Sequence, residues 1–109
     1  MNINITHNKN NDGDELKVTG EIDAYTAPEL KERLLTLTQV SGNTVYLDLS
    51  ETNYIDSTGI GVIIAAYKSS KSNRASIKIR GLTSRVKRLF DITGLSDIVV
   101  IEPAKEGKE

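Results

Sequence analysis

The sequence contains 109 residues, which suits one domain, and its 14 basic and 15 acidic side chains leave a net charge of −1. The balanced charge and the few aromatic residues, four Tyr and one Phe, argue against a nucleic-acid-binding protein, which needs a basic patch or a stacking platform. The absence of cysteine excludes disulfides, thiolate nucleophiles and thiolate metal sites.

No segment predicts a membrane span or a secretion signal. The N-terminal stretch MNINITHNKN lacks the apolar core of a signal peptide. The longest apolar run, residues 60–67, is interrupted by Gly61 and is too short to cross a bilayer. We therefore expect a soluble, cytoplasmic protein that does not bind membranes.

The N-terminal part alternates polar and apolar residues in two segments, which predicts the two strands of a hairpin. We expect strands at 2–6 and 16–22, with a turn at Asp12-Gly13 between them. A loop at 23–26 follows. The stretch Thr26-Ala27-Pro28-Glu29 then fits a capping box with Pro in the first turn of a helix.

Strands and helices alternate in the rest of the chain. The predicted elements are a strand at 44–50, a loop and then a helix within 53–71, a strand around Ile77 and Ile79, a helix at 83–94 that ends at Gly94, and a short strand at 98–101. Residues 102–109 are predicted to be a flexible C-terminal tail, so that the domain spans 1–101.

The order of these elements predicts the fold class. Strands that alternate with helices favour parallel pairs joined by crossovers, here after an N-terminal hairpin. Because the strands keep polar residues at alternate positions, one face of the sheet is expected to be wetter than the other. The expected fold is α/β with two layers, a mixed sheet of four to five strands and helices on one face. The residues expected on the wetter face are Lys17, Thr19, Tyr46, Asp48, Lys78 and Arg80.

The hexapeptide DSTGIG, which opens the second predicted helix, is the most distinctive segment. In the simplest interpretation Ser57 or Thr58 caps the helix, and Asp56 favours its positive end. A helix cap does not explain the two glycines of this segment. A cap does not require them, and each glycine in a helix costs about 0.5–1 kcal/mol of stability relative to alanine. Small side chains at Gly59 and Gly61 would let another molecule approach the backbone and would leave the Ser57 hydroxyl unshaded.

Ser57 lacks the partners of a catalytic nucleophile. The single histidine is His7, at the end of the first strand, whereas a serine hydrolase needs a base within hydrogen-bond reach. The segment DSTG differs by one extra residue from the Asp-[Ser/Thr]-Gly loop of aspartic proteases, whose all-β fold does not suit these helices. A phosphate-binding loop with its lysine is absent, so ATP binding is not expected. We therefore expect no metal or cofactor. We expect instead that this hydroxyl is phosphorylated by a kinase that is a separate protein.

Asp23 and Tyr25 form a second candidate site, because they follow a strand and precede a helix. If the strands at 16–22 and 44–50 run parallel, their loops meet at one edge of the sheet, and Asp23 and Tyr25 then adjoin residues 53–58. Two interpretations stay open at this point: a solvated loop with a half-buried tyrosine, or a binding surface.

Three motifs, GEIDAYTAPEL, YIDSTGIGV and RLFDITGL, occur in an order and at a spacing that resemble one family. The chain is similar to the anti-sigma factor antagonists, single STAS domains of bacterial partner-switching systems, and the resemblance extends to about residue 101. Its most specific part is an Asp-Ser-[Ser/Thr]-Gly loop that opens a helix. The resemblance implies that Ser57 is the phosphoacceptor. It also implies a partner-binding surface made by Asp23, Tyr25, Asp56, Ser57, Thr58 and Gly59.

The resemblance also implies partners. In this family a protein that is both anti-sigma factor and serine kinase phosphorylates the serine, and the unphosphorylated antagonist binds that protein and frees the sigma factor. A PP2C-type phosphatase resets the switch. Thr58 and the DITGL segment favour the stress-response branch. Two alternatives stay open, namely a STAS scaffold subunit of a larger signalling assembly and a small hydrolase that uses Ser57.

Overall fold

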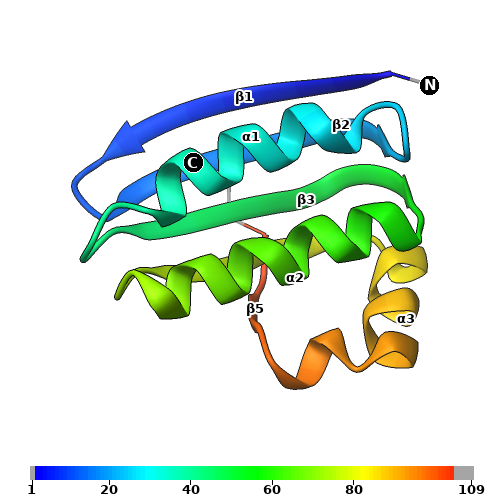
Figure 1. Ribbon diagram of the computed structural model, residues 1–109. Coiled ribbons are helices and arrows are strands. Elements are labelled where there is room, and N and C mark those ends of the chain that lie inside the picture. Colours follow the sequence, from blue (N-terminus) through cyan, green and yellow to red (C-terminus); the bar gives the residue numbers. More distant parts are fainter. Residues whose placement is uncertain (1, 105–109) are drawn as a thin grey trace.

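A computed structural model describes residues 2–104, which form one five-stranded sheet with helices packed against it (Figure 1). The strands are β1 (Ile3–Asn10), β2 (Gly13–Ile22), β3 (Thr44–Ile55), β4 (Ser76–Leu82) and β5 (Val100–Glu102). The helices are α1 (Ala27–Thr38), α2 (Ser57–Ser72) and α3 (Ser84–Thr93), followed by a short 3-10 helix, η1 (Leu95–Asp97). The expected α/β class is confirmed.

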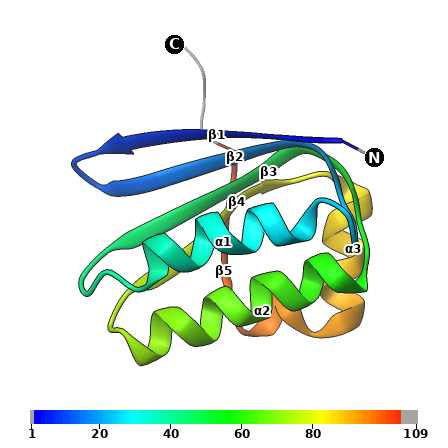
Figure 2. The ribbon, with the colours of Figure 1, turned by 45° about the horizontal axis from the view of Figure 1, so that its top comes forward.

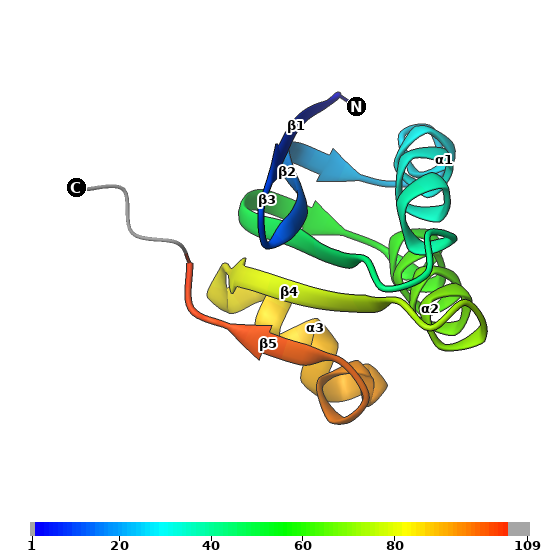
Figure 3. The same cartoon turned by 90° about the vertical axis from the view of Figure 1, so that its left-hand side faces the viewer.

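The strands lie in the sheet in the order in which they occur in the chain. β1 and β2 are antiparallel, and every later neighbour pair is parallel, as expected for a hairpin followed by crossovers. α1 and α2 lie side by side over one face of the sheet (Figure 2). In the edge-on view the same two helices lie together on one side of the strands (Figure 3).

The core lies between this face of the sheet and the helices. Leu16 and Val18 of β2 and Leu47 of β3 have no exposed surface, and they face Leu30 of α1 and Ile63 of α2, which are equally buried. α3 packs near β3 and β4 through Val86 and Phe90. These are positions at which the strand and helix periodicities predicted burial.

Several predicted boundaries are wrong. β1 continues to Asn10 and β2 begins at Gly13 instead of 16, so the hairpin turn contains only Asn11 and Asp12. β3 does not end at 50 but continues to Ile55, which pairs with Ile22, so the predicted loop shrinks to Asp56. This extension places Thr52 in a fully buried position, where its hydroxyl donates to the carbonyl of Val18 at 2.8 Å. The last strand begins at Val100, because η1 occupies 95–97.

The second face of the sheet is less wet than expected. Arg80 donates to Glu15 at 3.0 Å and lies 4.0 Å above the ring of Tyr46. Asp48 is buried, contrary to the expectation, because its carboxylate accepts hydrogen bonds from the backbone and the hydroxyl of Ser50. The pairing of β3 with β4 shifts in register directly after Asp48, where these hydrogen bonds form.

The predicted domain of 1–101 with a tail at 102–109 stays a prediction. Glu102 belongs to β5, and residues 105–109 lie outside the described part of the chain. None of the helices within 2–104 is both long enough and apolar enough to cross a bilayer.

Candidate functional site

The carboxyl ends of β2 and β3 bring the two candidate segments together. Ile22 and Ile55 are paired in the parallel ladder, and the backbone N–H of Asp56 donates to the carbonyl of Ile22 at 3.2 Å. The loop at 23–26 is therefore the neighbour of the first turn of α2, as the sequence predicted. Both segments lie at one end of the molecule, on the right of Figure 1.

Asp56 caps α2. Its Oδ1 accepts hydrogen bonds from the backbone N–H groups of Thr58 at 2.9 Å and Gly59 at 3.2 Å, and its own backbone is extended. The expectation that Ser57 or Thr58 is the cap is wrong, because the carboxylate already satisfies these two N–H groups. Ser57 occupies the first helical position, is exposed, and uses its hydroxyl in no hydrogen bond within residues 2–104.

The two glycines of this turn have different roles. A side chain at Gly59 would bring its Cβ within 2.5 Å of Ile55 and 2.7 Å of Ile22, so a glycine is needed there for packing against the ends of two strands. The expectation that both glycines serve an external approach is therefore wrong for Gly59. Gly61 is exposed, and a Cβ added to it would meet no atom within 4 Å. Of the two glycines, Gly61 alone leaves the helix surface open.

A shallow groove runs beside this open surface. It lies between the first turns of α1 and α2, and the exposed Thr58 is on its rim. Its lining residues are Ala27, Pro28, Lys31, Thr58, Gly61 and Val62. Another molecule that contacts Thr58 can therefore also reach the start of α1.

Asp23 holds the neighbouring loop in place. It is only 6% exposed, and its Oδ1 accepts from the backbone N–H groups of Tyr25 at 2.9 Å and Thr26 at 3.1 Å. The hydroxyl of Thr26 accepts from the N–H of Asp23 at 2.9 Å and donates to the carbonyl of Glu21 at 2.8 Å. The predicted capping box is therefore wrong, because this hydroxyl faces the loop and not the helix.

Tyr25 projects from the loop that Asp23 fixes. Its side chain is 87% exposed, so the expectation of a half-buried tyrosine is wrong. The backbone on both sides of this exposed ring is already fixed. Binding to another molecule would therefore remove less conformational entropy from the loop. The loop therefore holds an exposed Tyr25 on a fixed backbone next to the start of α2.

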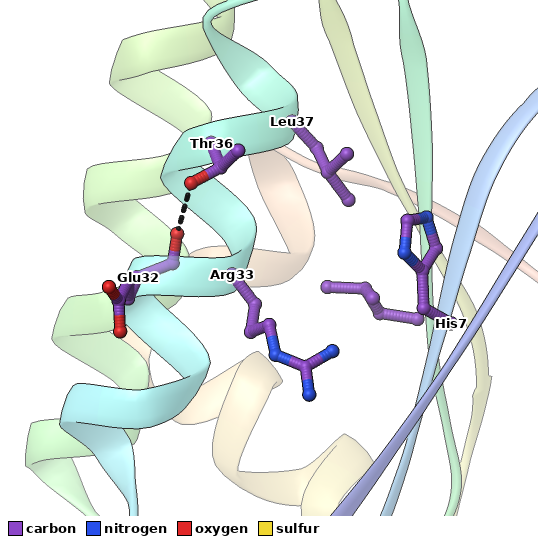
Figure 4. Close-up of a pocket in the computed structure, with 6 residues that line it drawn as sticks. His7, Glu32, Arg33, Thr36 and Leu37 are labelled. Carbon is purple, nitrogen blue, oxygen red and sulfur yellow. Dashed lines mark hydrogen bonds between the residues drawn. The ribbon is translucent and has the colours of Figure 1, made fainter.

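His7 lies far from Ser57. It is paired with Leu16, which is about 20 Å from Ile22 along β2 at roughly 3.3 Å per residue. Its Nε2 is 2.8 Å from Asp14, and with Arg33 it lines a pocket between α1 and the hairpin (Figure 4). This separation along β2 excludes a Ser57–His7 catalytic pair.

Asp14 is the buried carboxylate beside this pocket. Burial by itself would raise its pKa, but hydrogen bonds from His7 and Asn43, together with the nearby positive charges, hold the pKa of Asp14 below its usual 3.8. Asn43 also donates to the carbonyl of Leu37 at 3.1 Å. This cluster joins β1, β2 and the chain after α1, so it is structural. In the described part of the chain, no three His, Cys, Asp or Glu residues are placed to hold a metal.

An apolar groove between α3 and the end of β3 was not predicted from the sequence. Its rim carries Ile92, which is 73% exposed, and Tyr54, which is 40% exposed. The one signal that could have indicated it was an isoleucine on the solvent side of an amphipathic helix. The groove is lined by Tyr54, Ile55, Arg85, Val86, Arg88, Leu89 and Ile92.

Comparison with known proteins identifies close relatives. The family described as STAS domain matches residues 3–107. The anti-sigma-B factor antagonist of Bacillus subtilis (strain 168) is 41% identical over 107 residues, covering 98% of this chain and 97% of the relative. That of Listeria monocytogenes is 45% identical over 103 residues, covering 94% and 90%.

Solved structures share the fold. A putative anti-sigma factor antagonist from Thermotoga maritima superposes with a TM-score of 0.82 at 26% identity, over 90% of this chain and 85% of that one. The anti-sigma factor antagonist SpoIIAA in its unphosphorylated form gives a TM-score of 0.79 at 15% identity, over 94% and 90%. The second likeness is one of fold alone.

Proposed function

The chain belongs to the STAS domain family, and from this premise we propose that it is an anti-sigma factor antagonist, a protein that binds an anti-sigma factor and thereby frees a sigma factor. The names of its relatives support this function, since proteins 41% and 45% identical over nearly the whole chain are anti-sigma-B factor antagonists. Those names describe regulatory binding and not a reaction. The protein is accordingly not an enzyme, in agreement with the separation of Ser57 from His7.

The proposed switch is phosphorylation of Ser57. The observation that carries it is the exposed hydroxyl at the first position of α2, which makes no hydrogen bond within residues 2–104 because Asp56 caps the helix. In this proposal the anti-sigma factor is also the serine kinase, and a PP2C-type phosphatase restores the unphosphorylated form. These partners regulate transcription, so the proposed location is the cytoplasm. The assignment to the stress-response branch stays a prediction.

The proposed binding surface surrounds this hydroxyl. Tyr25, Ser57 and Thr58 are exposed and would contact the partner directly. Asp23 and Asp56 would act by holding the two backbones that present them, through the hydrogen bonds described above. Gly59 would contribute by letting α2 pack closely on the strand ends, as also described above.

A phosphate on Ser57 would block binding by its charge. It adds about −1.5 to −2 charge at neutral pH, and the positive end of α2 favours an anion by only about 0.3–1 kcal/mol. In water the fold can accommodate this group easily. In a closed interface the same charge must lose its water without a dedicated cationic partner, which costs several kcal/mol.

The test is a titration of the purified chain with the anti-sigma factor of its own host. We expect binding by the wild type and by Ser57→Ala, and loss of binding by Ser57→Glu. Incubation with the anti-sigma factor, ATP and Mg²⁺ should place phosphate on Ser57, as mapped by mass spectrometry. Thr58→Ala removes the neighbouring hydroxyl, and this variant should still carry phosphate on Ser57. Phosphate found mainly on Thr58 or elsewhere would refute the switch, and no binding by the wild type would refute the function.

A further inference from the structure

The groove between α3 and the end of β3 combines apolar surface with the positive charge of two arginines. Ile92 and Tyr54 expose their side chains on its rim, and Leu89 is half-buried between them and the core. Arg85 and Arg88 are exposed beside these apolar groups. Isolated surface hydrophobics need no explanation, but a groove in which they adjoin cations is typical of a binding surface.

The side chains of the two arginines have no polar partner within residues 2–104. Neither the Arg85 nor the Arg88 guanidinium makes a hydrogen bond or an ion pair with another described residue, and the ion pair of this helix is that of Lys87. The neighbouring Lys87, in contrast, donates to Asp91 at 2.9 and 3.0 Å. The spacing 85, 88, 89, 92 places the arginines on the same helical face as Leu89 and Ile92. This face therefore presents guanidinium groups next to an apolar strip.

The groove adjoins the proposed switch. Tyr54 and Ile55 line it and are followed by Asp56 and Ser57 at the start of α2. α3, the start of α2 and the loop that carries Tyr25 lie at the same end of the molecule (Figure 1). A partner that covers Ser57 and Tyr25 can thus reach α3 without leaving this end.

We propose that the groove formed by Tyr54, Arg85, Arg88, Leu89 and Ile92 is a second contact for the anti-sigma factor, and that it binds an acidic amphipathic segment of that protein. The proposal rests on the function proposed above. Its basis is charge complementarity, because arginines without a polar partner among residues 2–104 can bind carboxylates in a bidentate manner, and the apolar strip requires an apolar face on the same segment. The surface around Ser57 then supplies the switch, and α3 supplies additional affinity and orientation.

The experiment compares charge reversals at the two ends of the molecule. The test variant is Arg85→Glu/Arg88→Glu. The matched control, Lys68→Glu/Lys71→Glu, changes the net charge equally on exposed positions in the last turns of α2, at the opposite end of Figure 1. Affinity for the host's anti-sigma factor is measured by calorimetry at about 50 mM and about 300 mM NaCl, since salt screens exposed charges. Circular dichroism confirms that both variants are folded.

We expect the test variant to lose about tenfold or more in affinity at low salt, with a weaker salt dependence than the wild type, and the control to change by about twofold or less. Ile92→Ser should also weaken binding, whereas Val40→Ser, an exposed apolar position just beyond α1, should not. Wild-type affinity in both Arg85→Glu/Arg88→Glu and Ile92→Ser would overturn the proposal. If Ser57→Glu nevertheless abolishes binding in the same titrations, the proposed function stands and only the second contact is refuted.

Two other occupants of the groove would give different results. Self-association in sedimentation experiments that Arg85→Glu/Arg88→Glu abolishes would assign the groove to a second copy of the chain. Binding to phosphatidylglycerol vesicles that the same variant abolishes would assign it to a membrane surface. Either result, together with unchanged affinity for the anti-sigma factor, would overturn the proposal.

Discussion

Asp23 and Tyr25 are neighbours in the sequence but serve different purposes at the level of single residues. Asp23 is buried and uses one carboxylate oxygen to accept from two backbone N–H groups, whereas Tyr25 is almost fully exposed. The other oxygen of Asp23, Oδ2, is buried without a hydrogen-bond partner among the described residues. In the proposed binding surface, Asp23 therefore fixes the backbone of the loop and Tyr25 offers its side chain.

Substitutions should separate these two roles. Tyr25→Ala should weaken binding to the anti-sigma factor by about 1–2 kcal/mol, as exposed aromatic contacts do, and leave the melting temperature unchanged. Asp23→Ala should lower the free energy of unfolding by about 1 kcal/mol, because the N–H groups of Tyr25 and Thr26 lose their acceptor. Calorimetric titration and thermal unfolding measure the two effects. Normal affinity with a lower melting temperature in Tyr25→Ala would show that Tyr25 is structural.

At the scale of one element, α2 is built to approach the sheet closely at its start. Gly59 lets the first turn rest on Ile22 and Ile55, while Gly61, two residues later, points to open space. The carboxylate of Asp56 caps this turn, so the hydroxyl of the exposed Ser57 is not used for capping. The helix start is therefore tightly packed on one side and accessible on the other.

A matched pair of glycine substitutions tests this asymmetry. Gly59→Ala should destabilise the protein by about 1–3 kcal/mol, because its Cβ would overlap the side chains of Ile22 and Ile55. Gly61→Ala should instead stabilise it by about 0.5–1 kcal/mol, since an exposed helical glycine gains helix propensity without a clash. Urea unfolding of both variants gives the comparison. Equal effects of the two substitutions would contradict the difference in packing.

At the scale of the whole molecule, one charged cluster joins the hairpin to the chain beyond α1. Asp14 in β2 bonds to His7 in β1 at 2.8 Å and to Asn43, just before β3, at 3.0 Å. The cluster lies at the end of the sheet opposite to Ser57. Its stability contribution is consequently independent of the proposed switch.

Acid should weaken the fold through Asp14. Its pKa lies below 3.8 in the folded chain, so as the pH falls the unfolded chain takes up this proton first. The stabilisation is complete above the unfolded pKa and is lost as the pH falls through the folded one. Urea unfolding of Asp14→Asn below about pH 4 should therefore depend less on pH than that of the wild type. Asp12→Asn, in the exposed turn, is the control for the removal of one carboxylate.

Phosphorylation should leave the overall fold unchanged. The added charge lies on the exposed side of α2, where solvent screens it, while Asp56 keeps its capping bonds. NMR shifts between the two forms should be confined to residues near 23–26 and 55–62, with little change in melting temperature. Widespread shifts through the sheet and α3 would show that the switch works by a conformational change instead.

Local patterns in the sequence were sufficient for the order of the elements, the mixed sheet and the neighbouring positions of Tyr25 and Ser57. Alternating and helical periodicities report directly which side chains are buried, and parallel strands bring their loops to one edge. The DSTG segment likewise marked the start of α2 and its exposed hydroxyl. The strands and helices themselves depend on residues close together in the chain, and the meeting of the two loops follows from the parallel order of the strands.

Only the tertiary structure decided that Asp56 caps α2, that the hydroxyl of Thr26 faces Glu21, and that β3 continues to Ile55. It also decided that Gly59 serves internal packing and that Arg85 and Ile92 border a groove with Tyr54. Several side chains in each segment have the chemistry for these roles. Contacts between residues distant in the sequence, such as Ile22 with Ile55 and Thr52 with Val18, determine which of them is used.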